Sequence, residues 1–303
     1  MKSYNFKQVK EIFKILKDKD TLLIHSALQN LGRLEGEEFS RIPQVFRDFC
    51  LDLSARNTLI VPTFNYDFPK THYCDLREQK SVIGILNESL RKVAKYRSNH
   101  PMFNFVGFGE NAQAILSANT LENNPFSKDS VYSRLKEQNA LMLFLGIDIR
   151  VCTFVVYVEA MCGVKYRFFK PFLGEIITME SERFQTEFYH FCRPMDDGAK
   201  VSYVRLLKEL LANGILQFFP LGASGIYVLR TQELFSFLQN RLKEEPFFLL
   251  TNPPKAYYCY DKEAQVESLE REDFSGGGGD LIALYTALIS CYFYITLSKK
   301  TRG

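Results

Sequence analysis

The sequence predicts a layered α/β fold, and the order of its N-terminal segments carries that prediction. Apolar residues recur at three- and four-residue spacing over residues 6–16, with lysines between them, which is typical of an amphipathic helix. The short apolar run at 21–25 then predicts a buried strand. A second amphipathic helix over 42–49 and a second buried strand within 57–64 repeat this order. Helix, strand, helix, strand is the succession of a layered α/β protein.

Composition agrees with a globular enzyme. The chain has 303 residues, of which 46% are hydrophobic and 24% charged, which excludes disorder and a fibrous repeat. It has 27 Phe and no Trp, so the core is expected to consist of Phe and aliphatic side chains. The net charge of +3 is too small for a dedicated nucleic-acid binder and favours an anionic small ligand over a polycation.

The seven cysteines are odd in number and form no C-x-x-C pair, which argues against a disulfide framework and against a zinc site. We therefore expect a cytoplasmic protein that uses no metal. The first twenty residues have lysines every few positions and no unbroken apolar run, so they do not resemble a signal peptide.

The other elements follow from the same patterns. Helices are expected near residues 82–93, 111–118 and 153–161, with a Phe- and Gly-containing segment at 103–109 and a very hydrophobic strand at 140–147. Beyond residue 166 we expect strands at 175–178 and 184–192 and helices at 201–212 and 233–242, in a smaller subregion spanning 171–274. The segment LGASG at 221–225 lacks the lysine and the spacing of a P-loop and is expected to be a turn.

The C-terminal segment differs from the rest. Residues 1–274 are expected to form the catalytic domain, and residues 275–303 a glycine-rich joint followed by an apolar tail. The run at 281–298 has no charge and a basic flank, which permits a membrane anchor. Its Tyr, Thr, Ser and Cys residues favour a packed terminal helix or a segment foreign to the natural domain.

Several motifs occur in a fixed order at the ends of the predicted strands. They are I-H-S-A-L-x-x-L-G (24–32), V-P-T-F (61–64), R-S-x-H-P (97–101), N-P-F-S-x-x-S-V-Y-x-R-L (124–135), and L-F-L-G-I (143–147) followed by C-T-F-V-V-Y-V-E (152–159). Together they resemble the aminoglycoside 3-N-acetyltransferase family over residues 20–170. The resemblance implies a three-layer α/β/α fold with a mixed central sheet, distinct from the GNAT fold, and acetyl transfer from acetyl-CoA, or another short acyl-CoA, to an amine.

The resemblance also implies roles for particular residues. His25, Ser26, Ala27 and Leu28 would follow the pantetheine arm of CoA, and Arg97, Ser98 and Ser130 would contact its phosphates. The acceptor side would be formed by Thr63, Tyr66, Asp67 and Tyr166.

Structural roles remain open for three of these residues. Ser26 is also suited to turning the chain after a strand, Arg97 to a solvated helix face, and His100 to an ordered loop before Pro101.

The sequence departs from the family pattern at the expected general base. Members of the family resemble T-x-x-H-x-x-E, whereas this chain has Thr153, Val156 and Glu159. Valine cannot accept a proton. Either the chain is an inactive variant that still binds CoA, or Glu159, His25 or His100 takes the proton, or the amine arrives deprotonated. Glu159 is alternatively an ordinary helix carboxylate.

The acceptor is expected to be an amino sugar. Because the chain is net basic and has basic residues within 163–170, we expect a nucleotide-linked amino sugar for surface polysaccharides, with an aminoglycoside antibiotic as the alternative. A non-catalytic protein that binds CoA or a nucleotide sugar is the remaining alternative.

Overall fold

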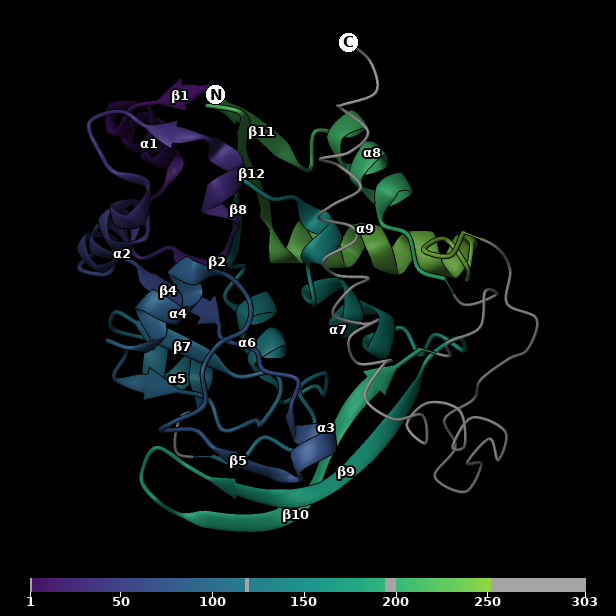
Figure 1. Ribbon diagram of the computed structural model, residues 1–303. Coiled ribbons are helices and arrows are strands. Elements are labelled where there is room, and N and C mark those ends of the chain that lie inside the picture. Colours follow the sequence, from purple (N-terminus) through teal and green to yellow (C-terminus); the bar gives the residue numbers. More distant parts are fainter. Residues whose placement is uncertain (1, 118–119, 194–199, 252–303) are drawn as a thin grey trace. The chain divides into compact units, whose positions relative to one another are not determined.

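The computed structural model describes residues 2–117, 120–193 and 200–251. Its largest sheet has seven strands, and Figure 1 shows their arrangement. The strand order is β11-β12-β8-β2-β4-β7-β6. The strands are β2 (Thr21–Ser26), β4 (Thr58–Pro62), β6 (Tyr96–Arg97), β7 (Phe105–Phe108), β8 (Leu141–Leu145), β11 (Gln217–Leu221) and β12 (Ser224–Arg230).

The sheet is mixed, as expected. Strand β2 lies parallel to both of its neighbours, pairing Leu22 with Leu59 of β4 and with Leu141 of β8. The strands outside this trio, β7 beside β4 and β12 beside β8, run antiparallel to their inner neighbours. Residues on β2 and β8 are almost all buried because helices cover both faces of the sheet.

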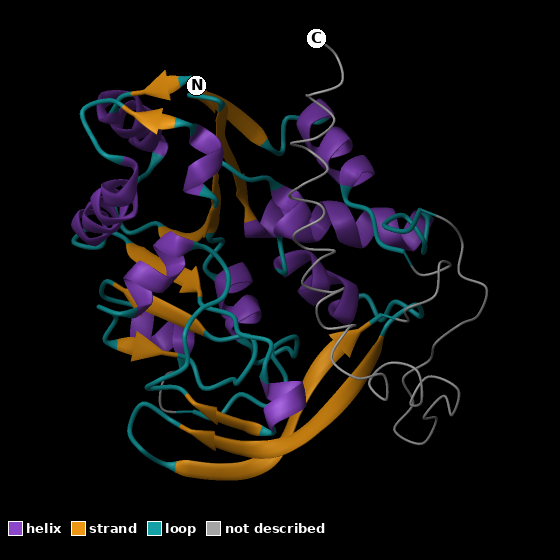
Figure 2. Cartoon of the chain, in the orientation of Figure 1, coloured by secondary structure: helices purple, strands orange, loops and turns teal. Residues whose placement is uncertain are grey.

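Two layers of helices cover the sheet, which confirms the three-layer α/β/α prediction (Figure 2). The helices of one layer share a core with Leu22 and Ile24 and are α1 (Phe6–Ile12), α2 (Ile42–Leu53) and α4 (Ile85–Arg91). The helices of the other layer share a core with Leu23 and Phe144 and are α5 (Ala112–Leu116), α6 (Val131–Glu137), α7 (Phe154–Met161), α8 (Val204–Ala212) and α9 (Thr231–Glu244). Alternate residues of each strand thus enter opposite cores.

Smaller elements complete this part of the chain. Strand β1 (Ser3–Tyr4) pairs with β3 (Arg33–Leu34), and β5 (Tyr73–Asp75), β9 (Phe168–Ile177) and β10 (Arg183–Cys192) form a three-stranded sheet. The short helices are α3 (Phe68–Thr71) and the 3₁₀ turns η1 (Phe13–Ile15), η2 (Leu28–Leu31), η3 (Phe39–Arg41) and η4 (Ile149–Val151).

Part of the segment 171–274, which the sequence predicts to be a smaller subregion, contributes to the main sheet. Strand β12 pairs with β8 from Leu141 to Leu145, so the hairpin at 217–230 extends this sheet. The sequence pattern hid this because the pairing joins segments far apart in the chain. The expected turn at 221–225 is confirmed as the hairpin between β11 and β12, where Gly222 has a φ of +60° and Ala223 N–H donates to Leu31 O.

Of the described residues, 165–168, 192–193, 200 and 250–251 belong to a second unit. Within it the N–H of Thr251 donates to the Lys200 carbonyl oxygen at 3.0 Å. The glycine-rich joint and the apolar tail predicted at 275–303 lie outside the described residues. Over the residues that the structure does describe, none of the helices has the length and apolar character needed to cross a bilayer.

Candidate functional site

The topology of the sheet singles out the carboxyl ends of β2 and β8. From β2 the chain continues through η2, whose Leu28 and Leu31 enter one core, and through α2 on that face to β4. From β8 it continues through η4 into α7 on the opposite face. Adjacent parallel strands whose connections leave in opposite directions form a topological switch point, and open α/β sheets bind ligands there. Ser26 ends β2, and the segment containing Val156 and Glu159 follows β8.

One backbone and one side-chain hydrogen bond hold the two strand ends close together. The N–H of Ala27 donates to Leu145 O at 2.8 Å, and the amide of Asn30 donates to Gly146 O at 2.9 Å. Gly146 has a φ of +70°, and a Cβ there would lie 2.5 Å from Ala27 O. The glycine of the L-F-L-G-I motif is therefore required both by its left-handed backbone and by this close approach.

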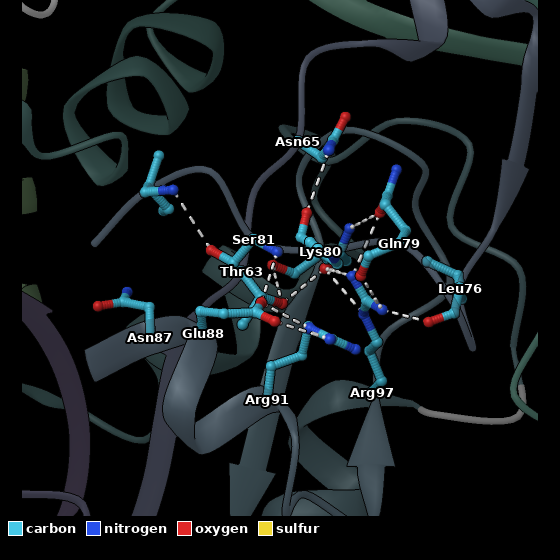
Figure 3. Close-up of polar contacts among 12 residues, drawn as sticks. Thr63, Asn65, Leu76, Gln79, Lys80, Ser81, Asn87, Glu88, Arg91 and Arg97 are labelled. Atoms are coloured by element: carbon cyan, nitrogen blue, oxygen red, sulfur yellow. Dashed lines mark hydrogen bonds and ion pairs between the residues drawn. The ribbon is translucent and has the colours of Figure 1, made fainter. Parts of the chain in front are cut away.

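A buried polar network lies along the same edge of the sheet (Figure 3). Thr63, which follows β4, donates to Oδ1 of Asn104 at 2.6 Å. Arg97, at the end of β6, donates to the same oxygen from Nε at 3.0 Å and from Nη2 at 2.8 Å. Gln79 joins the network by accepting from the Asn104 amide at 3.0 Å and donating to Pro101 O at 2.8 Å. The network fixes the loops at the carboxyl edge to one another.

Arg97 is a buried member of this network, not a solvated charge. It is 3% exposed, and it also donates to the carbonyl oxygens of Leu76 and Gln79. Burial lowers its pKa to about 10, so the guanidinium is still charged at neutral pH. Because its donors are engaged with protein acceptors, its visible role is to hold the loops, and the expected contact with a CoA phosphate requires those bonds to rearrange.

The two serines expected at the phosphates also have internal partners. The Ser98 hydroxyl accepts from the N–H of Phe105 at 2.9 Å, and Ser130 caps α6 by accepting from the N–H of Ser133 at 3.3 Å. Both residues are fully buried. Their hydroxyls satisfy backbone groups where a strand or a helix begins.

His100 is oriented by the backbone of its own loop. Its Nδ1 accepts from the N–H groups of Met102 at 3.1 Å and Phe103 at 3.0 Å, which requires the tautomer protonated at Nε2. Burial, and secondarily the proximity of His190, lowers the pKa of His100 to about 3. The nitrogen that a base would use is thus occupied, which favours the loop role considered for this residue.

His25 lies on the face of the sheet that α7 covers. Its ring stacks on Phe144 with centroids 4.9 Å apart and an interplanar angle of 6°. It is 6% exposed, and burial lowers its pKa to about 4, so the imidazole is neutral at neutral pH. Ala27 and Leu28, which follow it, are buried, with Leu28 in the core on the opposite face.

Helix α7 carries the residues of the expected base motif. Thr153 is its N-cap residue, and its hydroxyl hydrogen-bonds to the hydroxyl of Tyr132. Val156 is half-buried against the core, and Glu159 is fully buried. Residues three apart on a helix share a face, so Val156 and Glu159 lie in the relation the sequence predicts.

The acceptor-side residues differ in their burial. Thr63 is fully buried, Tyr66 is half-buried with its ring 5.8 Å from that of Phe103, and Asp67 is exposed at the start of α3. Tyr166 is fully buried and belongs to the second unit.

Sequence reasoning missed the amides that connect these positions, Asn87, Asn104 and Gln79. Asn104 had a detectable signal, since it is one amide in the apolar run M-F-N-F-V, and a buried amide needs partners. Asn87, on α4, donates to Pro62 O at 2.7 Å and accepts from Ser26 at 2.9 Å. Nothing in the local sequence of Asn87 or Gln79 distinguishes them from surface residues.

Comparison with known proteins agrees with this architecture. The family model for aminoglycoside 3-N-acetyltransferase matches residues 23–243. The fold is similar to that of aminoglycoside acetyltransferase AAC(3)-Xa, at 22% identity, a TM-score of 0.65, and coverage of 80% of this chain and 93% of that one. It is also similar to AAC-IIIb solved with CoASH, at 18% identity, a TM-score of 0.65, and coverage of 82% and 97%.

The YokD protein from Bacillus subtilis is a further structural neighbour, at 18% identity, a TM-score of 0.63, and coverage of 79% and 93%. No curated protein matches the sequence significantly. The family model spans both strands of the switch point and continues through most of the second helical layer. Because that match covers well over half of the sequence, the chain belongs to the aminoglycoside 3-N-acetyltransferase family, whose members are acetyl-CoA-dependent N-acetyltransferases.

Proposed function

We propose that this protein transfers the acetyl group of acetyl-CoA to an amino group of an aminoglycoside. The observation that carries the proposal is the family match over residues 23–243, which includes every strand end at the switch point. Two structural neighbours in this family are aminoglycoside acetyltransferases, and one of them was solved with CoASH. These findings favour the aminoglycoside over the nucleotide-linked amino sugar that the net charge suggested.

In the proposed reaction a neutral amine attacks the thioester carbon. A C–N bond forms, the C–S bond breaks, the amine loses one proton, and the thiolate of CoA is released and protonated. The step needs a proton acceptor and donors for the developing oxyanion. Ser26, Ala27 and Leu28 would lie along the acyl-CoA, and Thr63, Tyr66 and Asp67 on the acceptor side. The exposed carboxylate of Asp67 suits a cationic acceptor.

Glu159 is our choice for the proton acceptor. With Val156 at the position of the expected histidine, Glu159 is the titratable side chain that remains on that face of α7. His100 is a poorer choice because its Nδ1 already accepts two backbone hydrogen bonds. Loss of the histidine predicts slow turnover, since general base catalysis contributes about 10²- to 10⁴-fold.

A nucleotide-linked amino sugar remains the second candidate acceptor, because the chain carries a net charge of +3. A thiol-release assay with acetyl-CoA distinguishes the two acceptors. We expect release of CoA with an aminoglycoside above the rate without any amine, and no increase with a UDP- or TDP-linked amino sugar. Turnover of the nucleotide sugar alone would reverse the assignment. Calorimetric binding of CoA without turnover of either amine would identify a CoA-binding protein without acetyltransferase activity.

A further inference from the structure

The hydroxyl of Ser26 has a fixed hydrogen-bond polarity. Ser26 ends β2 at the switch point and is half-buried, and its Oγ lies 2.9 Å from Oδ1 of Asn87 on α4. Asn87 is 3% exposed, so its amide is held by protein groups and not by solvent. The pair connects residues 61 positions apart in the chain.

The direction of this bond follows from the other partner of Asn87. Nδ2 of Asn87 lies 2.7 Å from the carbonyl oxygen of Pro62, which can only accept. The NH₂ group must therefore face Pro62, and Oδ1 must face Ser26. Because Oδ1 is also only an acceptor, the Ser26 hydroxyl is required to donate. Gly84 makes room for this oxygen, since a Cβ there would lie 2.9 Å from it.

A serine hydroxyl has one proton and two lone pairs. At Ser26 the proton is directed to Asn87, and within the described part of the chain no N–H or O–H group donates to its oxygen. The hydroxyl therefore offers a ligand lone pairs and no proton. A group that can only accept, such as a thioester carbonyl or a phosphate oxygen, gains no hydrogen bond there.

We propose that Ser26 accepts a hydrogen bond from an N–H group of the ligand, and that Asn87 is the positioning residue that imposes this polarity. The inference rests on the proposed function, whose two substrates both carry N–H groups: the amides of the pantetheine arm and the amine of the acceptor. In this role the Ser26 hydroxyl recognises a hydrogen-bond donor on the ligand. It does not donate a hydrogen bond to the oxyanion that develops on the thioester.

The test uses the full chain and isothermal titration calorimetry. The ligands are CoA, two CoA analogues that each have an ester oxygen in place of one amide N–H, and an aminoglycoside. We compare the wild type with Ser26→Ala, with Ser26→Thr, which keeps the hydroxyl, and with Ser54→Ala as a matched control. Ser54 lies at the end of α2, where its hydroxyl donates to Leu51 O. Thermal unfolding confirms that each variant is folded. If Ser26→Ala does not fold, Ser26→Cys is used in its place.

Suppose that the N–H group that donates to Ser26 belongs to the pantetheine arm. We then expect the wild type, Ser26→Thr and Ser54→Ala to bind one ester analogue about 3- to 10-fold more weakly than CoA. Ser26→Ala should bind that analogue and CoA equally well. If the N–H group belongs instead to the amine of the aminoglycoside, Ser26→Ala should lose about 3- to 10-fold in affinity for the aminoglycoside while its affinity for CoA stays unchanged.

Asn87→Ala provides the test of the positioning role. Without Oδ1 the Ser26 hydroxyl is free to turn and to donate to an ester oxygen, so the discrimination between amide and ester should weaken while CoA still binds. If Ser26→Ala discriminates as the wild type does and binds the aminoglycoside equally well, the inference is wrong although the proposed function stands. If the wild type binds neither CoA nor the aminoglycoside, the proposed function fails and the inference with it.

Discussion

Arg97 and Asn104 form a two-point hydrogen bond in the interior, in which Nε and Nη2 of Arg97 reach the same Oδ1 at 3.0 and 2.8 Å. Among the described residues, this guanidinium donates to neutral amide and carbonyl oxygens and to no carboxylate. A buried charge of this kind persists only where its donors are satisfied. The pair therefore marks a position at which the fold depends on a full set of polar contacts.

Replacing Arg97 with Met should destabilise the protein by about 3 kcal/mol, because the carbonyl oxygens of Leu76 and Gln79 lose their donor and Asn104 Oδ1 keeps only the bond from Thr63. Arg97→Lys should recover only part of this loss, since an ammonium group cannot reproduce the planar arrangement of donors. Urea denaturation measures both effects. Arg56→Met is the control, because Arg56 and Asp18 form an ion pair at 3.7 Å whose side chains are 72% and 76% exposed. An equal loss for Arg56 and Arg97 would contradict this account.

Introducing the missing base should increase the rate. Val156→His places an imidazole three residues before Glu159 on α7, and we expect CoA release with the preferred amine to rise by about 10²- to 10⁴-fold. The rate should fall as the pH drops below about 6.5, where an ordinary imidazole becomes protonated. Val156→Gln, which is polar but not basic, should give no increase. If the wild type already turns over rapidly and histidine adds nothing, the proton leaves by another route.

Glu122 makes stability depend on pH. Its Oε1 accepts from the N–H of Val131 at 2.9 Å, and Nη2 of Arg134 lies 4.0 Å from the same oxygen. Burial raises the pKa of Glu122 from 4.5 to about 7. Between those pH values the folded state holds a proton that the unfolded state has lost, so this group's contribution to stability falls as the pH rises.

Glu122→Gln removes that dependence and keeps the acceptor for Val131. The variant should therefore gain stability relative to the wild type from pH 4.5 to pH 7, by up to about 3 kcal/mol. Urea titrations across this pH range measure the difference in unfolding free energy between the variant and the wild type. The contributions of the histidines cancel in this difference because both proteins contain them. Glu11→Gln, at an exposed ion pair with Lys14, is the control and should give a flat difference. A flat difference for Glu122→Gln as well would show that its carboxyl group titrates normally.

Substitutions at Gly84 and Gly36 distinguish the cost of backbone strain from the cost of a steric clash. Both have positive φ values, +81° and +79°, but a Cβ at Gly84 would meet Asn87 Oδ1 at 2.9 Å and Ser26 O at 3.1 Å, whereas nothing lies within 4 Å at Gly36. Gly36→Ala should cost about 1 kcal/mol for the left-handed backbone alone. Gly84→Ala should cost about 1–3 kcal/mol more and weaken CoA binding, because it displaces the Asn87 amide. Equal unfolding free energies for the two variants would argue against the packing around Ser26.

The sequence predicted those helices and strands correctly whose local hydrophobic pattern reflects their burial in the folded protein. Strands β2, β4 and β8 are apolar runs buried on both faces, and helices α1, α2 and α8 have one apolar side, so the pattern alone located them. The hairpin of β11 and β12 was recognised only as a turn. Its place in the main sheet depends on pairing with β8, about 80 residues earlier, and local periodicity does not encode such a contact.

By itself the sequence determined the layered α/β class, the motifs at the strand ends and the absence of the expected histidine at Val156. These are properties of residue type and spacing, which need no third dimension. Only the tertiary structure decided that Arg97, Ser98 and His100 have buried partners, and that Asn87 and Asn104 connect the loops of the site. The physical reason is that a polar side chain's role depends on which acceptors and donors surround it once it is buried. Those partners come from distant segments that the folded sheet brings to one edge.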